Sequence, residues 1–426
     1  MKSSNFALIV LFFILLMFSP LLQPLDPTMA NAQSNSSCPS SDTLHVVLAG
    51  GAPNSFALLT AGTPSAFYFS YSAYYGVFPA YYPTGGYDYN LSLVDWISSN
   101  SNFTQWTFNV KPGLKWSNGQ SVTSQDILAT YSSKYAFNAT YDFTGVHTEV
   151  TSENALNSSA AVFNLNKADA HFPETISQLV LSTVIPASMV NEYGTGFTGF
   201  ESDAPVVGPF YPVNYQLGQT QMTLLRNPYF HPQPIACALD LTFVEATTQG
   251  ASLLKGGAVD LAELDPISVA GVVSNPNIHI LDQSDIWIET LDYNITVFPF
   301  NMTAFRQALV YGIDQSQIVQ QALAGYGETA YNSEGTIPSA IANYYNPNQM
   351  TYQYNVSTAM ALLNSIGMKL VNGHLQYPNG TDVTLTLWGD DSRSWDTIIS
   401  SIIQTNLQQN LGIDVSTQLT TYGSNP

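Results

Sequence analysis

Residues 106–127 read Trp106-Thr-Phe-Asn-Val-Lys-Pro-Gly-Leu-Lys-Trp-Ser-Asn-Gly-Gln-Ser-Val-Thr-Ser-Gln-Asp-Ile127. The first five residues alternate apolar and polar side chains, which is the pattern of a half-buried strand. Turn sequences, Lys111-Pro-Gly113 and Asn118-Gly119, stand on either side of Leu114-Lys-Trp116, so we predict a β-hairpin. Thr123 and Asp126 have the spacing of a capping box, which predicts that a helix begins there.

Helix and strand patterns continue to alternate in the second half of the chain. Asp314 has the position of a cap for one helix, and Gly325 has the position of its end. Alternating strands and helices predict mixed α/β lobes rather than a sandwich or a bundle. The predicted elements are helices within 305–311, 314–325, 355–367 and 395–412, and strands at 383–388 and 413–415.

The composition is acidic and poor in charge. Asp and Glu number 30 against 10 Lys and Arg, and only 9% of residues are charged, so a nucleic acid or an anionic membrane surface would be repelled. Polarity comes instead from amides, hydroxyls and 25 tyrosines. Nine Asn-x-Ser/Thr sequons suit a glycosylated surface protein. They begin at Asn35, Asn90, Asn102, Asn138, Asn157, Asn294, Asn301, Asn355 and Asn379.

Residues 1–32 have the features of a signal peptide. Lys2 precedes an apolar run from Phe6 to Leu22, and Ala30-Asn-Ala32 is a cleavage pattern, so we expect maturation near Gln33. An uncleaved membrane anchor is the alternative, because the apolar run approaches spanning length. Either outcome places the chain at the cell surface or in the secreted fraction, on the extracytoplasmic side of the membrane.

The two cysteines, Cys38 and Cys237, would lie in an oxidising compartment, and each precedes a strand-like run. We predict that they form a disulfide, with two free buried thiols as the alternative.

Four segments of the chain match a known pattern, in the same order. They are residues 106–127, Gly208-Pro-Phe-Tyr211 with Leu225-Arg-Asn-Pro-Tyr-Phe230, Leu254-Lys-Gly-Gly-Ala-Val-Asp-Leu261, and Phe305-Arg-Gln-Ala-Leu-Val-Tyr-Gly-Ile-Asp314 followed by Ala324-Gly-Tyr-Gly327. This pattern resembles the family 5 extracellular solute-binding proteins, the dipeptide and oligopeptide receptors of ABC importers. The resemblance spans residues 43 to 420.

The resemblance implies a two-lobed, periplasmic-binding-protein-like α/β fold with a hinge. On that basis residues 43–85 and 204–284 form the core of a discontinuous first lobe, 86–203 its accessory subdomain, and 285–426 the second lobe. The chain ends soon after Leu411-Gly-Ile-Asp-Val415, whereas the family continues, so we expect a C-terminally truncated second lobe. The continuation usually holds an aspartate that pairs with the amino terminus of a peptide.

The function implied is capture of a small solute by hinge closure and its delivery to an ABC permease. We expect a monomer without a cofactor. Peptides and oligosaccharides both fit an acidic, aromatic-rich chain, and the tyrosines from Tyr71 to Tyr82 are an alternative lining for the site. Each candidate ligand residue has a bland alternative as an ordinary core or surface side chain. The candidates are Phe56, Trp287, Tyr326 and Trp388, with Asp390 or Asp391 to receive an amine or a sugar hydroxyl.

Other conspicuous residues have structural interpretations. Trp106, Phe108 and Trp116 are predicted to form a core, Arg306 to fix its lobe through hydrogen bonds, and Asp314 to cap a helix.

Other functional classes have weaker support, so we predict that the chain is not an enzyme. A glycoside hydrolase needs two opposed carboxylates, but Asp390, Asp391 and Asp396 flank a single helix start. A serine hydrolase would need a Gly-x-Ser-x-Gly motif, which is missing. The six histidines have no ligand spacing, although some relatives bind nickel complexes. A surface receptor or adhesin that has lost transport remains the alternative outside enzymes.

Overall fold

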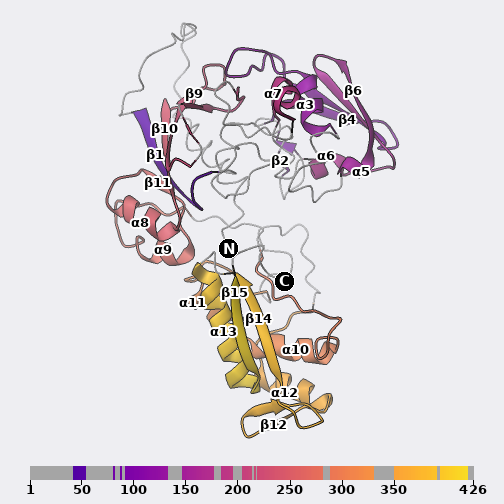
Figure 1. The fold of residues 1–426 in the computed structure, drawn as a ribbon, viewed down its shortest axis with the longest axis vertical. Coiled ribbons are helices and arrows are strands. Elements are labelled where there is room, and N and C mark those ends of the chain that lie inside the picture. Colours follow the sequence, from indigo (N-terminus) through magenta and orange to yellow (C-terminus); the bar gives the residue numbers. More distant parts are fainter. Residues whose placement is uncertain are drawn as a thin grey trace. The chain divides into compact units, whose positions relative to one another are not determined.

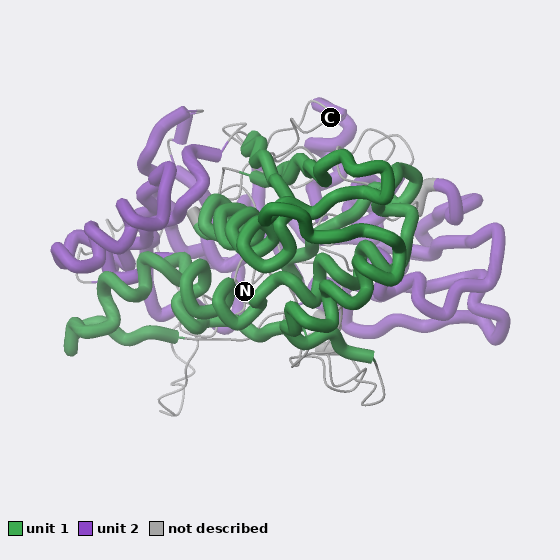
Figure 2. The backbone as a smooth tube through the Cα atoms, turned by 90° about the horizontal axis from the view of Figure 1, so that it is seen from below, with its two compact units in different colours: residues 1–4, 264–426 green, residues 5–263 purple. Residues whose placement is uncertain are grey.

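A computed structural model describes residues 42–53, 80–81, 87–88, 92–132, 146–176, 184–194, 204–213, 215–216, 218–281, 288–330, 350–390 and 394–420. The chain divides into two compact units, residues 5–263 (purple in Figure 2), called the first unit here, and residues 264–426 (green), called the second unit. Within the described ranges, no helix combines the length and the apolar character needed to cross a membrane. The predicted signal peptide, Cys38, Phe56, Trp287 and Asp391 lie outside these ranges.

The first unit contains a five-stranded mixed sheet in the order β11-β1-β10-β9-β8 (Figure 1). Strand β1 pairs in parallel with both β10 and β11, and β10 pairs antiparallel with β9. Cys237 directly precedes β10 and is disulfide-bonded, but Cys38 is not described, so the pairing of these two residues stays a prediction. The strands are β1 (Thr43–Ala49), β8 (Phe210–Val213), β9 (Gln221–Arg226), β10 (Ala238–Val244) and β11 (Leu261–Ala262), and helix α8 (Thr247–Lys255) follows β10.

A second, antiparallel sheet in the same unit has the order β4-β5-β7-β6. Its inner face is aromatic, because Phe108, Phe163 and Phe172 pack with ring centroids 5.5–6.2 Å apart. Trp106, Phe108 and Trp116 are buried in this core, as predicted. The elements are β4 (Val94–Ser99), β5 (Gln105–Val110), β6 (Val150–Asn157), β7 (Ala160–Leu165), α3 (Ser124–Tyr131), α5 (Val146–Glu149), α6 (Phe172–Ile176) and α7 (Ala187–Tyr193); β2 (Ala80–Tyr81) and β3 (Tyr87–Asp88) pair separately.

The predicted hairpin between residues 106–110 and 114–116 is wrong. Strand β5 lies between β4 and β7, so both of its edges are already occupied. Residues 114–116 instead turn back around Asn118-Gly119, where the Trp116 N–H donates to the Gln120 carbonyl at 2.8 Å. The capping box is confirmed, because the Asp126 carboxylate accepts from the Thr123 N–H at 2.7 Å.

The second unit has a core formed by helices around a small parallel strand pair. Strand β14 pairs in parallel with β15 from Thr384↔Asp414 to Asp390↔Thr420, and the side chains of α13 pack against the pair. Asp314 caps α11 by accepting from the Gln317 N–H at 3.1 Å, and Arg306 donates to the Phe300 carbonyl at 2.6 Å, both as predicted. The elements are α9 (Pro266–Ala270), α10 (Thr303–Gly312), α11 (Gln315–Gln321), α12 (Val356–Ser365), β12 (Lys369–Val371), β13 (His374–Gln376), β14 (Thr384–Asp390), α13 (Ser394–Leu411) and β15 (Asp414–Thr420).

The division between the units begins at residue 264, whereas the boundary expected from the sequence begins at 285. Helix α9 accounts for part of this difference. Ile267 packs against a cluster made of Ala322, Leu323 and Trp395, all of which belong to the unit that contains residues 264–426.

Candidate functional site

Two of the described candidate residues, Trp388 and Asp390, lie at the carboxyl end of β14. Leu385 and Leu387 pack against the core of their unit, and a Cβ on Gly389 would lie 2.8 Å from the Ser400 Oγ of α13. Side chains alternate along a strand, so Trp388 and Asp390 lie on the opposite face, away from α13. The Trp388 side chain is 43% exposed and Asp390 is half-buried, so both remain accessible.

The start of α13 adds further groups to this edge. Trp395 is buried, and its Nε1 donates to the Glu289 Oε1 at 3.4 Å. Asp396 is also buried in the first turn of the helix, where the positive end of the helix dipole favours a carboxylate. Glu289 and Asp396 were not predicted as site residues. Glu289 stands only two residues after the predicted Trp287, and that proximity was the available signal.

Tyr326 follows the turn that ends α11. Ala324 and Gly325 have positive φ values of 48° and 83°, which reverse the chain after α11. The Tyr326 N–H then donates to the Leu323 carbonyl at 2.7 Å, and Leu323 packs in the cluster with Trp395. That Tyr326 shares one site with Trp388 and Asp390 stays a prediction.

The first unit has an equivalent strand-end of its own. After β1, Gly50 and Gly51 have φ values of 101° and 76°, and the Gly51 N–H donates to the Val244 carbonyl at 3.0 Å. A Cβ on Gly51 would approach the Glu245 carboxylate oxygens to 3.3 Å, so the glycine allows an exposed carboxylate to lie over the loop. Sequence reasoning missed Glu245, although it directly follows β10, the parallel partner of β1. Phe56 follows this loop but is not described.

In each unit, a carboxylate or an accessible aromatic ring therefore lies at the carboxyl end of a parallel strand. In open α/β sheets, ligands bind outside the carboxyl ends of the strands. Carboxylates accept hydrogen bonds from amines and sugar hydroxyls, and an exposed indole face stacks on apolar or sugar surfaces. Among the described residues, no group of three or more His, Cys, Asp and Glu side chains has the arrangement of a metal site.

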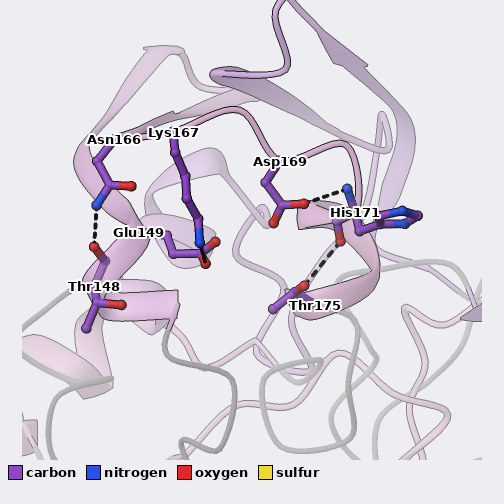
Figure 3. A network of polar contacts seen from close by, with 7 residues as sticks. All are labelled: Thr148, Glu149, Asn166, Lys167, Asp169, His171 and Thr175. Atoms are coloured by element: carbon purple, nitrogen blue, oxygen red, sulfur yellow. Dashed lines mark hydrogen bonds and ion pairs between the residues drawn. The ribbon is translucent and has the colours of Figure 1, made fainter.

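A second polar cluster lies in the first unit, between β7 and α6 (Figure 3). Lys167 Nζ lies 2.8 Å from the Glu149 Oε1, and Asp169 accepts from the His171 N–H at 2.8 Å. The Lys167 and His171 side chains are mostly exposed, and the Lys167–Glu149 contact joins the start of β6 to the end of β7. We interpret this cluster as solvent-exposed contacts that stabilise the loop between β7 and α6.

Comparison with known proteins identifies the class of fold and then the family. The structure resembles NikZ of Campylobacter jejuni in complex with Ni(L-His), with a TM-score of 0.70, 18% identity, and coverage of 90% of this chain and 75% of the other. A mannohexaose-bound periplasmic oligopeptide-binding protein of Thermotoga maritima gives a TM-score of 0.65 at 18% identity, covering 91% of this chain and 73% of the other. The chain therefore has the two-lobed α/β fold of the periplasmic binding proteins.

The sequence profile of the bacterial extracellular solute-binding proteins, family 5 (middle region), matches residues 92–425, so the chain belongs to this family. The oligopeptide-binding protein AppA of Bacillus subtilis is 21% identical over 342 residues, which are 78% of this chain and 62% of AppA. The chain thus spans less than two thirds of the length of this relative.

Proposed function

We propose that this protein is an extracytoplasmic solute-binding component of an ABC importer, and that it binds its ligand without transforming it. Membership of a family of extracellular solute-binding proteins supports this assignment. The observation that carries it is the carboxyl end of β14, where an accessible indole ring and a carboxylate occupy the strand face that α13 leaves open.

The proposed binding cycle is hinge closure of the two lobes. A ligand that contacts groups of both units stabilises the closed arrangement by its difference in affinity for the closed and open states. Trp388, Asp390 and Tyr326 would supply one side, while Phe56, Trp287 and the Glu245 loop remain candidates for the rest. The membrane permease then reads closure as occupancy, and neither step requires a cofactor.

For the ligand we favour a peptide, with an oligosaccharide as the alternative. AppA is named for oligopeptide binding, and the Thermotoga maritima relative holds mannohexaose. The chemistry of the two classes differs at this site. A peptide amine would form a charge-assisted hydrogen bond with Asp390, whereas a sugar ring would depend mainly on stacking against Trp388.

The test is a thermal-shift and calorimetry screen of the full chain with dipeptides, longer peptides and oligosaccharides. A ligand present at 100 times its Kd should raise the free energy of unfolding by about 2.7 kcal/mol. Trp388→Ala should weaken binding of either ligand class at least tenfold. Trp96→Ala is the matched control, because Trp96 is 50% exposed on the other unit's antiparallel sheet and should leave affinity unchanged.

Asp390→Asn separates the ligand classes. Loss of binding for peptides with a free amine, and retained binding of the same peptides after amine acetylation, identifies Asp390 as the amine acceptor. Oligosaccharide binding that survives Asp390→Asn but not Trp388→Ala favours the alternative. If no ligand class raised the melting temperature, the solute-binding assignment would be wrong. If Trp388→Ala and Trp96→Ala had equal effects on affinity, the proposed site would be wrong.

A further inference from the structure

The sequons that the structure describes all present their asparagine to solvent. An asparagine can be glycosylated only if its amide nitrogen reaches the transferase, so exposure is the first requirement. Exposure alone does not separate one sequon from another. The six are Asn102, Asn157, Asn294, Asn301, Asn355 and Asn379.

Two of these sequons have the same local geometry. The Thr296 hydroxyl donates to the Asn294 Oδ1 at 2.6 Å, and the Thr296 N–H donates to the same oxygen at 3.2 Å. At the second, the Thr381 hydroxyl and N–H donate to the Asn379 Oδ1 at 2.7 and 3.0 Å. Both hydrogen bonds use the carboxamide oxygen. The Nδ2 of each asparagine makes no side-chain hydrogen bond to any described residue.

Both sequons also lie in tight turns. The Val297 N–H donates to the Asn294 carbonyl at 3.1 Å, and the Gly380 N–H donates to the Tyr377 carbonyl at 2.9 Å. Gly380 has a φ of 81°, the left-handed conformation that a glycine adopts without strain. A turn of this kind projects the asparagine from the surface, with Oδ1 held and Nδ2 free.

In the other four sequons the side chains are arranged differently. The Thr104 hydroxyl accepts from the Asn100 Nδ2 at 2.9 Å, and the Thr303 hydroxyl accepts from the Arg306 Nη2 at 3.2 Å. The Asn157 Oδ1 accepts from the Ser159 N–H at 2.8 Å. The Asn355 Oδ1 accepts from the Ser357 hydroxyl at 2.7 Å, but it also caps α12 by accepting from the Thr358 N–H at 3.0 Å.

Exposed apolar side chains follow Asn294, and one of them contacts a ring beside Asn379. Ile295, Val297 and Phe298 are 60%, 49% and 54% exposed in the segment that follows Asn294. The Phe298 ring lies 5.2 Å from the Tyr377 ring, and Tyr377 stands two residues before Asn379. Contiguous apolar side chains on a protein surface need a cover, or they promote association.

From this geometry we propose that Asn294 and Asn379 are N-glycosylation sites whose glycans cover the Ile295–Phe298 patch. The donor class is an oligosaccharide linked to a polyprenyl phosphate or diphosphate. The Asn Nδ2 forms a bond to the anomeric carbon of the sugar while the bond from that carbon to the phosphate oxygen breaks. The phosphate leaves with the electron pair, and the Nδ2 proton passes to a base of the transferase.

The test is glycopeptide mass spectrometry of the full chain isolated from its native cells. Peptides that contain Asn294 and Asn379 should carry a glycan mass on most molecules. Thr296→Ala and Thr381→Ala should each abolish the glycan at their own site, whereas the matched controls Thr296→Ser and Thr381→Ser should retain it. Unmodified asparagine at both positions, or full occupancy in the Thr→Ala variants, would overturn the proposal.

The covering role has a separate readout. The Asn294→Gln/Asn379→Gln variant should elute later than the wild-type chain from a hydrophobic-interaction column and should self-associate more. Adding Phe298→Ser should reverse that change, because it removes the exposed ring. Asn157→Gln, on the other unit, serves as the control and should leave elution unchanged. If the double variant elutes with the wild-type chain, the glycans do not cover the patch.

Discussion

The antiparallel sheet β4-β5-β7-β6 and the parallel pair β14–β15 use aromatic side chains in opposite ways. In the first, Phe108, Phe163 and Phe172 are buried against each other with ring centroids about 6 Å apart, so these rings stabilise the fold and are not available to a ligand. In the second, Trp388 stands on the strand face away from α13 and keeps 43% of its surface exposed. Aromatic content alone therefore does not reveal a binding site, whereas burial separates structural rings from available ones.

The largest expected effect tests this contrast directly. Phe108→Ala should lower the free energy of unfolding by about 3–5 kcal/mol, because it leaves a cavity among rings that cannot close around it. Trp388→Ala should change stability by less than about 0.5 kcal/mol, the usual range for exposed positions. Urea denaturation followed by circular dichroism measures both. Similar losses in the two variants would break the comparison.

The loss of stability on removing a capping carboxylate should also depend on its burial, and we expect losses of intermediate size. Asp126 is buried, and it accepts from the Thr123 N–H at 2.7 Å and from the Ala187 N–H at 2.8 Å, joining α3 to α7. Asp126→Ala should therefore cost about 2–3 kcal/mol of stability, since it removes charge-assisted bonds and leaves buried donors. Asp314→Ala, which removes an ordinary helix cap, should cost about 1 kcal/mol. The reverse order in denaturation experiments would contradict the assignment of Asp126 as a link between helices.

The sequence predicts elements better than it predicts their partners. The caps at Thr123 and Asp314 were visible because their partners lie three residues away, and the structure shows each bond. The pairing of 106–110 with 114–116 was not correct, because the neighbours of a strand depend on residues as distant as 160–165. For the candidate site, Trp388 and Asp390 could be proposed from their strand position, and they stay predictions, whereas Glu245 required the fold to place it beside Gly51.

Substitution of Tyr293 should change the free energy of unfolding at neutral pH by a smaller amount, and in the opposite direction. Its buried hydroxyl has no hydrogen-bond partner among the described residues, so Tyr293→Phe should stabilise the chain by about 1 kcal/mol. Burial raises the pKa of Tyr293 from 10 to about 12, although the charge of Arg306 opposes the shift.

The raised pKa of Tyr293 defines a pH window for the same test. Between pH 10 and 12 the unfolded chain loses this proton while the folded chain retains it, so stability should fall with pH, by up to about 2.7 kcal/mol. Tyr293→Phe should remove this part of the alkaline loss. Tyr354→Phe, at an exposed ring, is the control and should leave the slope unchanged. An unaltered alkaline slope in Tyr293→Phe would contradict the buried position of the hydroxyl.

The smallest effect is expected at the Lys167–Glu149 pair of Figure 3, because the Lys167 side chain is 63% exposed and water screens its charge. The hydrogen bond to Glu149 and its charge raise the pKa of Lys167. The stabilisation is therefore present below pH 10.5, the ordinary Lys value, and is lost as pH rises through the raised pKa. Lys167→Met should leave the urea midpoint at pH 7 unchanged within error, with or without added salt, which weakens attraction to a solvent-exposed charge further. A loss of stability comparable to that of Asp126→Ala would mean that the Lys167–Glu149 pair supports the sheet as strongly as a buried carboxylate. That result would contradict the rule, drawn from Trp388 and Phe108, that burial decides how much a side chain contributes to stability.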